Sequence, residues 1–222
     1  MTNKGLVFNL ILKGFSSIII QSLLLRELLI IFHGNELTLG IILCVWLLSG
    51  ALGSILIAPL IRFFNQIRLF VLLQTLASIY FIFAIVLIRL APGYRQIIPI
   101  EFFSLGAVAG LSASALGFLS FCDGALFTIG FNLLTLSPLK KDSSMARLYL
   151  LESSGFMLGG ILFTFYFLST FNSFQIAFIV GALTALAGFW LLAKDKNVSI
   201  KIAVILLFFL FCALFQTAPL LQ

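Results

Sequence analysis

Long hydrophobic runs alternate with short polar breaks along the whole chain. A transmembrane α-helix needs about 20 mostly apolar residues, and seven runs reach this length. They lie roughly at 6–32, 38–58, 69–91, 98–137, 147–170, 173–193 and 202–220. The breaks, such as RFFNQIR and KDKNVSIK, are too short to form another domain. The pattern predicts an all-α fold, a polytopic integral membrane helix bundle in which residues 1–222 form a single transmembrane domain without a soluble catalytic domain.

The number of crossings depends on the run at 98–137, which is long for one span and nearly long enough for two. Asp123 and Gly124 lie near its middle and suit a tight turn, which would give eight spans. Lys and Arg gather on the cytoplasmic side of membrane proteins. Seven spans put nine of them on the N-terminal side and two on the other, whereas eight spans give eight against three with the N-terminus outside. This comparison favours seven spans and a cytoplasmic N-terminus.

Composition points to lipid as the surrounding medium. Hydrophobic residues make up 62% of the chain and charged residues 9%, whereas a soluble domain carries about 25% charge. Mean hydropathy is +1.24. The net charge of +6 comes mostly from Lys and Arg in the short breaks, so we expect the lipid bilayer as a partner and no nucleic acid. The start, MTNKGLVFNLILKGF, is interrupted by Lys13 and lacks a cleavage site, so we expect a retained first span and not a signal peptide.

The first span carries a polar face. At 100° per residue, six polar side chains fall within an arc of about 140°: Asn9, Lys13, Ser16, Ser17, Gln21 and Glu27. Lys13 and Glu27 are about 21 Å apart along the axis, so they do not pair with each other. Either this face packs against polar neighbours inside the bundle, with Arg26 extending to the interface, or it forms one wall of a polar pathway or binding cavity.

The segment HGNEL predicts the first connection between spans. Gly34 and Asn35 tolerate left-handed backbone and are expected to end the first helix. Glu36 would then lie at the start of the second helix, where the helix dipole stabilises a carboxylate. We interpret His33 and Glu36 as turn residues at the membrane surface.

Two glycine pairs have the spacing that lets membrane helices approach closely: Gly106 with Gly110, and Gly155 with Gly159. Tyr149 and Glu152 are predicted on the same face as the second pair. A carboxylate at such an interface needs a partner, and the candidates are Arg147, Lys13 and Arg26. We predict a buried ion pair there, and we hypothesise that Glu27 and Glu152 meet at one helix–helix centre.

Common catalytic and metal-binding patterns are missing from the sequence. The three cysteines are isolated in apolar runs, and one histidine cannot supply a His-rich metal site or bis-histidine haem ligation. There is no glycine-rich nucleotide loop, phosphate-binding loop or nucleophile elbow. We therefore predict no catalytic residue, no metal and no cofactor. The candidate intramembrane polar site consists of Lys13, Gln21, Arg26, Glu27, Tyr149 and Glu152.

Five segments occur in a characteristic order: QSLLLRELLIIFHGNELTLG, WLLSGALGS, IEFF with Glu101, GALFTIGF, and ARLYLLESSGFMLGGILFTF. In this order they resemble the membrane region of membrane-bound spermidine synthase-like proteins, over roughly residues 14–193. By this resemblance the retained positions are Gln21, Arg26, Glu27, Gly34, Asn35, Glu36, Tyr149, Glu152, Gly155, Gly159 and Gly160.

In that family a hydrophobic helix bundle precedes a soluble aminopropyltransferase-like domain. This chain departs from the pattern at Thr128, where the family often has proline, and at His33, which precedes Gly-Asn-Glu. It stops at Gln222, about where the soluble domain would begin, so we expect the nucleoside-binding loop and the catalytic acid to be absent. The resemblance implies a membrane anchor or partner for a soluble spermidine synthase-like protein, and we expect a bacterial inner (plasma) membrane location.

A looser resemblance concerns half of a major facilitator transporter. LGSILIAPLIRFFNQIR and GFNLLTLSPLKKDSSMAR look like cytoplasmic connections of that fold, although the first lacks the expected acidic residue and glycine–arginine ending. Three functions stay open. The leading one is the membrane half of a spermidine synthase-like system. The others are a transporter- or permease-like module for a small solute, with the charged first span lining a route, and a structural subunit that associates with other membrane subunits.

Overall fold

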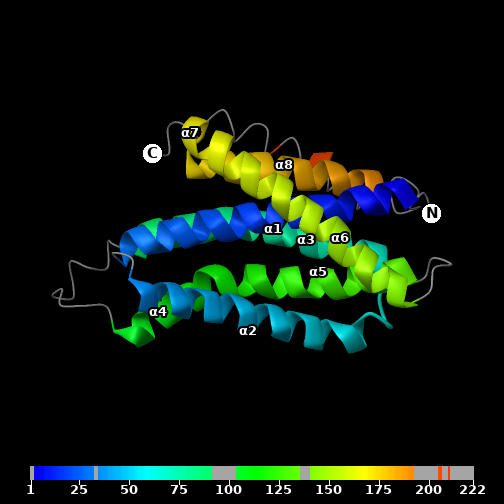
Figure 1. Ribbon diagram of the computed structural model, residues 1–222, viewed down its shortest axis with the longest axis horizontal. Helices are drawn as coiled ribbons and strands as arrows, with labels where there is room; N and C mark the ends of the chain where they lie inside the picture. Colours follow the sequence, from blue (N-terminus) through cyan, green and yellow to red (C-terminus); the bar gives the residue numbers. More distant parts are fainter. Residues whose placement is uncertain are drawn as a thin grey trace.

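The computed structural model is built from helices (Figure 1), and it contains no strand within the ranges it describes. It describes residues 3–32, 35–91, 104–135 and 141–192, together with 205, 206 and 210. The helices are α1 (Asn3–Ile31), α2 (Glu36–Leu60), α3 (Gln66–Leu90), α4 (Leu105–Ser112), α5 (Phe118–Thr135), α6 (Lys141–Leu162), α7 (Leu168–Thr170) and α8 (Ser173–Leu192). A π-helical turn at Ala113–Gly117 joins α4 to α5, and another at Phe163–Phe167 joins α6 to α7.

Six helical spans of the described chain are long and apolar enough to cross a membrane. They correspond to the first six predicted hydrophobic runs, which confirms the all-helical, membrane-protein character of the fold. The fourth span is one continuous segment, Leu105–Thr135. This span has no turn at Asp123–Gly124, so the eight-span alternative, which depended on such a turn, loses its basis. The run at 202–220 lies outside the described residues apart from 205, 206 and 210, so a seventh span stays a prediction.

Polar caps define where α2, α3 and α4 begin. Asn35 has extended backbone, with φ at −113°, and its side chain accepts a hydrogen bond from the N–H of Thr38 at 2.7 Å. Asn65 and Ser104 cap α3 and α4 in the same manner, which satisfies N–H groups that have no partner within the helix. The prediction that Asn35 ends the first helix in left-handed backbone is wrong, because Asn35 begins the second helix. His33 and Gly34 lie outside the described residues.

Consecutive spans run in opposite directions, as the colour order along the helices shows (Figure 1). The main helix pairs are α1 with α6, α2 with α5, and α3 with α8, while α1 also packs against α8 and α3. The largest buried cluster joins Leu23 and Leu24 of α1 with Phe81 and Ile85 of α3 and Phe178 of α8. The first span is therefore an interior helix, with neighbours on several sides.

Glycine contacts bring two helix pairs close together. In the α1–α6 pair, a Cβ added at Gly155 would meet the carbonyl of Ile11, and one added at Gly14 would meet the carbonyl of Glu152. In the α2–α5 pair, a Cβ at Gly53 would meet the Phe121 carbonyl, and one at Gly124 the Gly50 carbonyl. Only a hydrogen in place of a methyl group permits such approach.

Of the two glycine pairs predicted to pack against a neighbouring helix, only the second does so among the described residues. Gly159 lies against Phe15 and Ile18 of α1, so both glycines of the second predicted pair contact the neighbouring helix. The first pair does not: among the described atoms, a Cβ at Gly110 would meet nothing within 4 Å, and one at Gly106 only the capping hydroxyl of Ser104. The prediction that Gly106 and Gly110 form a close helix contact is therefore wrong for this part of the chain.

The π-helical turn at Ala113–Gly117 has a partner on α3. A π-helical turn shifts backbone hydrogen bonds out of the regular α-helical pattern. The carbonyl of Ser114 in this turn accepts a hydrogen bond from the hydroxyl of Tyr80. The widened turn is thus stabilised by a neighbouring helix.

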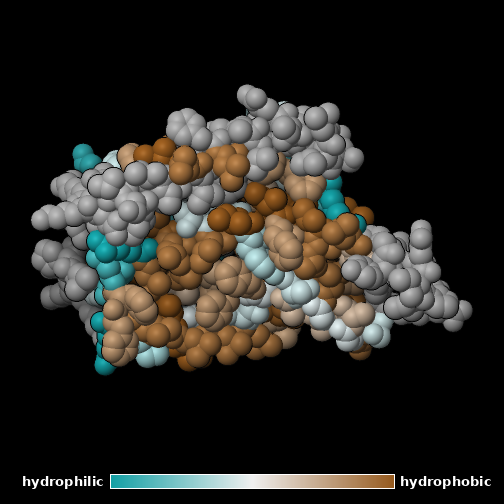
Figure 2. Space-filling view, turned by 180° about the vertical axis from the view of Figure 1, so that it is seen from behind, coloured by the Kyte–Doolittle hydropathy of each residue, from teal (hydrophilic) through white to brown (hydrophobic). Residues whose placement is uncertain are grey.

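The outer surface is mainly apolar, as expected for contact with lipid. Figure 2 shows a face that is hydrophobic over its middle, with hydrophilic residues gathered toward the two ends of the long axis. Large exposed apolar side chains include Leu47 and Ile55 of α2 and Leu150 and Met157 of α6. A soluble protein rarely exposes such contiguous apolar surface.

Candidate functional site: a buried charged triad

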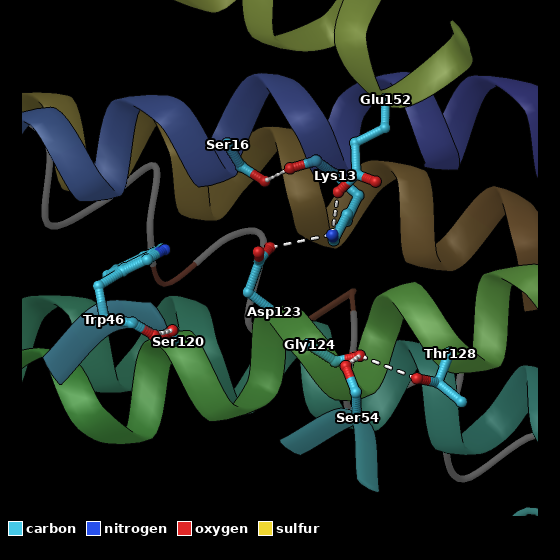
Figure 3. Close-up of polar contacts among 9 residues, drawn as sticks. All are labelled: Lys13, Ser16, Trp46, Ser54, Ser120, Asp123, Gly124, Thr128 and Glu152. Carbon is cyan, nitrogen blue, oxygen red and sulfur yellow. Dashed lines mark hydrogen bonds and ion pairs between the residues drawn. The ribbon is translucent and has the colours of Figure 1, made fainter. Parts of the chain in front are cut away.

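Lys13 lies between two carboxylates inside the bundle (Figure 3). Its ammonium forms an ion pair with Glu152 of α6 and lies 3.1 Å from Oδ1 of Asp123 of α5. The side chains of Lys13 and Glu152 are 4% and 7% exposed, whereas that of Asp123 is 25% exposed. We call these three residues the charged triad.

The triad lies deep within the spans that carry it. At 1.5 Å per residue, Lys13, Asp123 and Glu152 are about 12–18 Å from the ends of their spans on the N-terminal side. Their spans are 28, 31 and 27 residues long, and the hydrocarbon core of a bilayer is about 30 Å thick, so the three charges lie inside the spans and away from their ends. Lys13 cannot extend to either interface while it contacts both acids.

Local packing explains why Lys13 and Glu152 meet. Gly14, the residue after Lys13, touches the backbone of Glu152, so the two helices cross most closely where the ion pair forms. The hydroxyl of Ser16 donates to the carbonyl of Lys13 at 3.0 Å. The ring of Phe127 lies 5.6 Å from the Lys13 ammonium, within the range of a cation–π interaction.

Contacts between α2 and α5 set the position of Asp123. The hydroxyl of Ser54 donates to the carbonyl of Gly124 at 3.0 Å, and the hydroxyl of Ser120 donates to the carbonyl of Trp46 (Figure 3). Together with the backbone approach of Gly50 to Gly124, these bonds fix the height and rotation of α5. Asp123 is thereby held toward α1 by contacts made at Gly124 and Ser120 of the same helix.

The triad is unbalanced in charge. One ammonium and two carboxylates carry a net charge of −1 when all three are ionised. Breaking a buried pair typically costs about 3–5 kcal/mol because a charge is left without compensation. An excess carboxylate inside a membrane protein therefore requires a proton or a cation nearby.

A small cavity with both polar and apolar lining residues adjoins the triad. Its volume is about 30 Å³, and a cavity of about 10–15 Å³ on this measure is enough for one water molecule. The lining includes polar side chains from five helices: Lys13, Ser16 and Ser17 of α1, Gln74 and Ser78 of α3, Asp123 of α5 and Thr184 of α8, with the indole of Trp46 from α2. Both polar atoms of the buried Gln74 amide lack a hydrogen-bond partner.

A second polar cluster lies toward the opposite end of α1. The carboxylate of Glu27 accepts a hydrogen bond from the hydroxyl of Ser173 in α8, and Nη2 of Arg89 in α3 lies 3.7 Å from it. The Arg89 guanidinium also lies 4.8 Å from the ring centroid of Phe174. This cluster ties three helices together about 21 Å from Lys13 along α1.

The Glu27 cluster predicts a modest effect of charge removal. Glu27→Gln is expected to lower the free energy of unfolding by about 1 kcal/mol or less. The amide oxygen still accepts the Ser173 hydroxyl, and the lost partner, Arg89, is 35% exposed. Denaturant unfolding in detergent measures the effect. Glu27→Leu, which removes the hydrogen bond as well, serves as the comparison and should lose more; equal losses for the two variants would contradict the prediction.

The structure brings together only part of the predicted polar site. Lys13 and Glu152 meet, and Lys13 is thus the partner of Glu152 among the three candidates. Glu27 does not join them, so the hypothesis that Glu27 and Glu152 share one centre is wrong. Gln21 is half-buried, Arg26 is exposed, and Tyr149 is 65% exposed, so it does not share the packed face of Glu152.

Sequence reasoning missed two residues that matter most here. Asp123 was considered only as a possible turn residue in the eight-span alternative, yet an acid in the middle of an apolar run was itself the signal. Gln74 sits in the third span as a single uncharged polar residue with no motif around it. Both side chains belong to other spans, and only the packing of the helices shows that they lie beside the polar face of the first span.

Comparisons with protein-family models, curated proteins and solved structures find no significant match to this chain. Within the described ranges, no group of three or more His, Cys, Asp or Glu side chains is placed to hold a metal ion.

Proposed function

We propose that this chain is a transporter-like membrane module in which the charged triad exchanges a monovalent cation, either a proton or a metal ion. The observation that carries the proposal is the contact of one buried ammonium with two carboxylates, Asp123 and Glu152. Ionisable residues inside membrane spans are costly and commonly mark ion pathways.

A purely structural ion pair would need only one acid for one base. The second acid adds a negative charge that the triad does not neutralise, and a cation that binds and leaves would alternate the site between net charges of −1 and zero. Asp123 is the more accessible acid and lines the cavity. We therefore assign Asp123 as the entry point and the Lys13–Glu152 pair as its fixed background.

The Glu27 cluster supports a route with two distinct ends. It connects α1, α3 and α8 near the end of the spans opposite to the N-terminus, so the triad is separated from that surface by tied helices. A transport cycle of this module would require these contacts to loosen. Their moderate strength, with a partly exposed Arg89, is compatible with such opening.

Reconstitution tests the proposed function. The purified chain is inserted into liposomes, and the decay of an imposed H⁺ or Na⁺ gradient is followed with an entrapped indicator. Vesicles with the native chain should lose the gradient faster than protein-free vesicles, and Asp123→Asn and Glu152→Gln should abolish most of the difference. Gly160→Ala, at a position with open space around it, is the matched control. Gradient decay that is equal in all samples, or unchanged by the acid substitutions, would overturn the proposal.

A second candidate function is the membrane half of a spermidine synthase-like system, anchoring a soluble aminopropyltransferase-like partner. One observation favours it. The two main segments of the resemblance are 21–40, which begins in α1, and 146–165, which begins in α6, and these two helices pack closely together. A neighbouring reading frame for the soluble half, and its co-purification with this chain, would support it. Co-purification with unrelated membrane subunits alone would favour a structural role.

Orientation in a bacterial inner membrane is part of the proposal. The N-terminus is expected in the cytoplasm, with Lys140, Lys141, Lys194, Lys196 and Lys201 on the same side. In a cysteine-free background, a cysteine at the exposed Phe63 between α2 and α3 should resist impermeant reagent in intact cells. A cysteine at the exposed Ser104 should react. The reverse pattern would contradict this orientation.

A further inference from the structure

We propose that the cavity beside the triad is a binding site for one Na⁺ ion. The proposal rests on the proposed function for its biological role and deepens it by naming the ion. The cavity lies where α1, α2, α3, α5 and α8 face one another, and Lys13 and Asp123 of the triad line it whereas Glu152 does not.

Charge balance selects a monovalent ion. The ionised triad carries a net charge of −1, and the remaining polar lining consists of uncharged hydroxyl and amide groups. One Na⁺ brings the site to neutrality, whereas a divalent ion would leave a net charge of +1 inside the bilayer. The Lys13 ammonium, which also lines the cavity, is held by both acids (Figure 3).

The lining offers oxygen atoms, which hard cations prefer as ligands. The hydroxyl of Ser16 donates its hydrogen to a backbone carbonyl, which leaves its lone pairs available. The hydroxyls of Ser78 and Thr184 lie 2.7 Å apart, and each is also within hydrogen-bond distance of a backbone carbonyl, that of Gln74 and that of Gly181, so two protons serve three possible contacts. Their protons are engaged, so these two oxygens face the cavity mainly as acceptors.

Gln74 is the residue that marks the cavity as a ligand site. It is 3% exposed, it lines the cavity, and neither polar atom of its amide has a hydrogen-bond partner. A buried amide without partners is destabilising, and nearly all buried polar groups in folded proteins are satisfied. An ion coordinated by Oε1 satisfies the acceptor, and a water molecule on the ion can accept from Nε2.

The size of the cavity limits the ligand. A volume of about 30 Å³ holds one small ion with at most a water molecule beside it. An organic cation with several carbon atoms does not fit. The site therefore takes Na⁺ in preference to a polyamine or an organic ammonium ion.

Thermal unfolding in detergent, without any measurement of flux, tests the site. Replacing choline by Na⁺ at equal ionic strength should raise the Tm of the native chain by about 5 °C at concentrations far above Kd. Gln74→Leu should fold without Na⁺ at least as stably as the native chain, because its amide has no partner to lose, and its Tm should not respond to Na⁺. Ser112→Ala is the matched control: this buried hydroxyl also lacks a partner but does not line the cavity, so the Na⁺ response should persist.

Equilibrium binding of ²²Na⁺ provides the second measurement, which holds even if a variant does not fold. The native chain should bind one Na⁺, and excess choline should not displace it. Equal Tm values in Na⁺ and choline, a retained Na⁺ response in Gln74→Leu, or the absence of ²²Na⁺ binding would overturn the site. Proton flux without Na⁺ binding would refute this inference and leave the proposed function standing; Na⁺ binding without any cation flux would do the opposite.

Discussion

Lys13→Met is expected to lower the free energy of unfolding by about 3–5 kcal/mol. The substitution keeps an unbranched side chain of similar length but removes the charge that Asp123 and Glu152 share. The two acids then face each other in the interior of the bundle without compensation. Denaturant titration in detergent micelles, followed by circular dichroism, measures the loss.

Lys4→Met is the matched control for this prediction. Lys4 lies on the same helix but is exposed, and substitutions at such positions usually change stability by about 0.5 kcal/mol or less. If Lys13→Met cost no more than Lys4→Met, the ammonium would not be a structural partner of the two acids. A large loss for both would point instead to a general sensitivity of α1.

Gly155→Ala is expected to destabilise the chain by about 1–3 kcal/mol. The added methyl group would meet the carbonyl oxygen of Ile11 and the backbone nitrogen of Phe15. Backbone atoms cannot turn aside as a flexible side chain can, so α1 and α6 must separate. Separation also stretches the Lys13–Glu152 ion pair, because Gly14 and Glu152 touch in the same crossing. The measurement is again unfolding in micelles.

Gly160→Ala offers a close control within the same helix. A Cβ at Gly160 would meet no described atom within 4 Å, and alanine exceeds glycine in helix propensity by about 1 kcal/mol. This variant is therefore expected to be as stable as the native chain or more so. Comparable destabilisation by the two substitutions would show that the α1–α6 crossing is not the cause.

The spans were predictable because apolar length is a property of each segment alone. The six described spans follow the first six hydrophobic runs, and their ends follow from caps such as Asn65 and Ser104. The π-helical turn at Ala113–Gly117 was not predictable, since it depends on Tyr80 of another helix reaching the Ser114 carbonyl. The choice between glycine pairs also depends on the neighbours, because Gly110 and Gly155 differ in what faces them and not in their local sequence pattern.

The candidate site was predictable in part for a related reason. The helical wheel correctly placed Lys13 on an interior face, and glycine spacing correctly placed Glu152 at a close contact. The residue of α1 that lies opposite Glu152 depends on how α1 and α6 are aligned along their axes. The sequence of either helix alone does not determine this alignment. For that reason the grouping of Glu27 with Glu152 is wrong. Asp123 was missed because the local Asp-Gly pair suggests a turn, whereas the apolar residues on both sides continue the helix.

Removing the charges of the triad one after another is the most direct test of whether one lysine and two acids form a single buried centre. The unfolding free energy of Lys13→Met is compared with that of the triple variant Lys13→Met/Asp123→Asn/Glu152→Gln, in which no charge remains. The triple variant is expected to recover most of the loss of Lys13→Met, because the two uncompensated carboxylates are gone. If the losses of the separate substitutions simply added, so that the triple variant were the least stable, the three residues would not act as one centre.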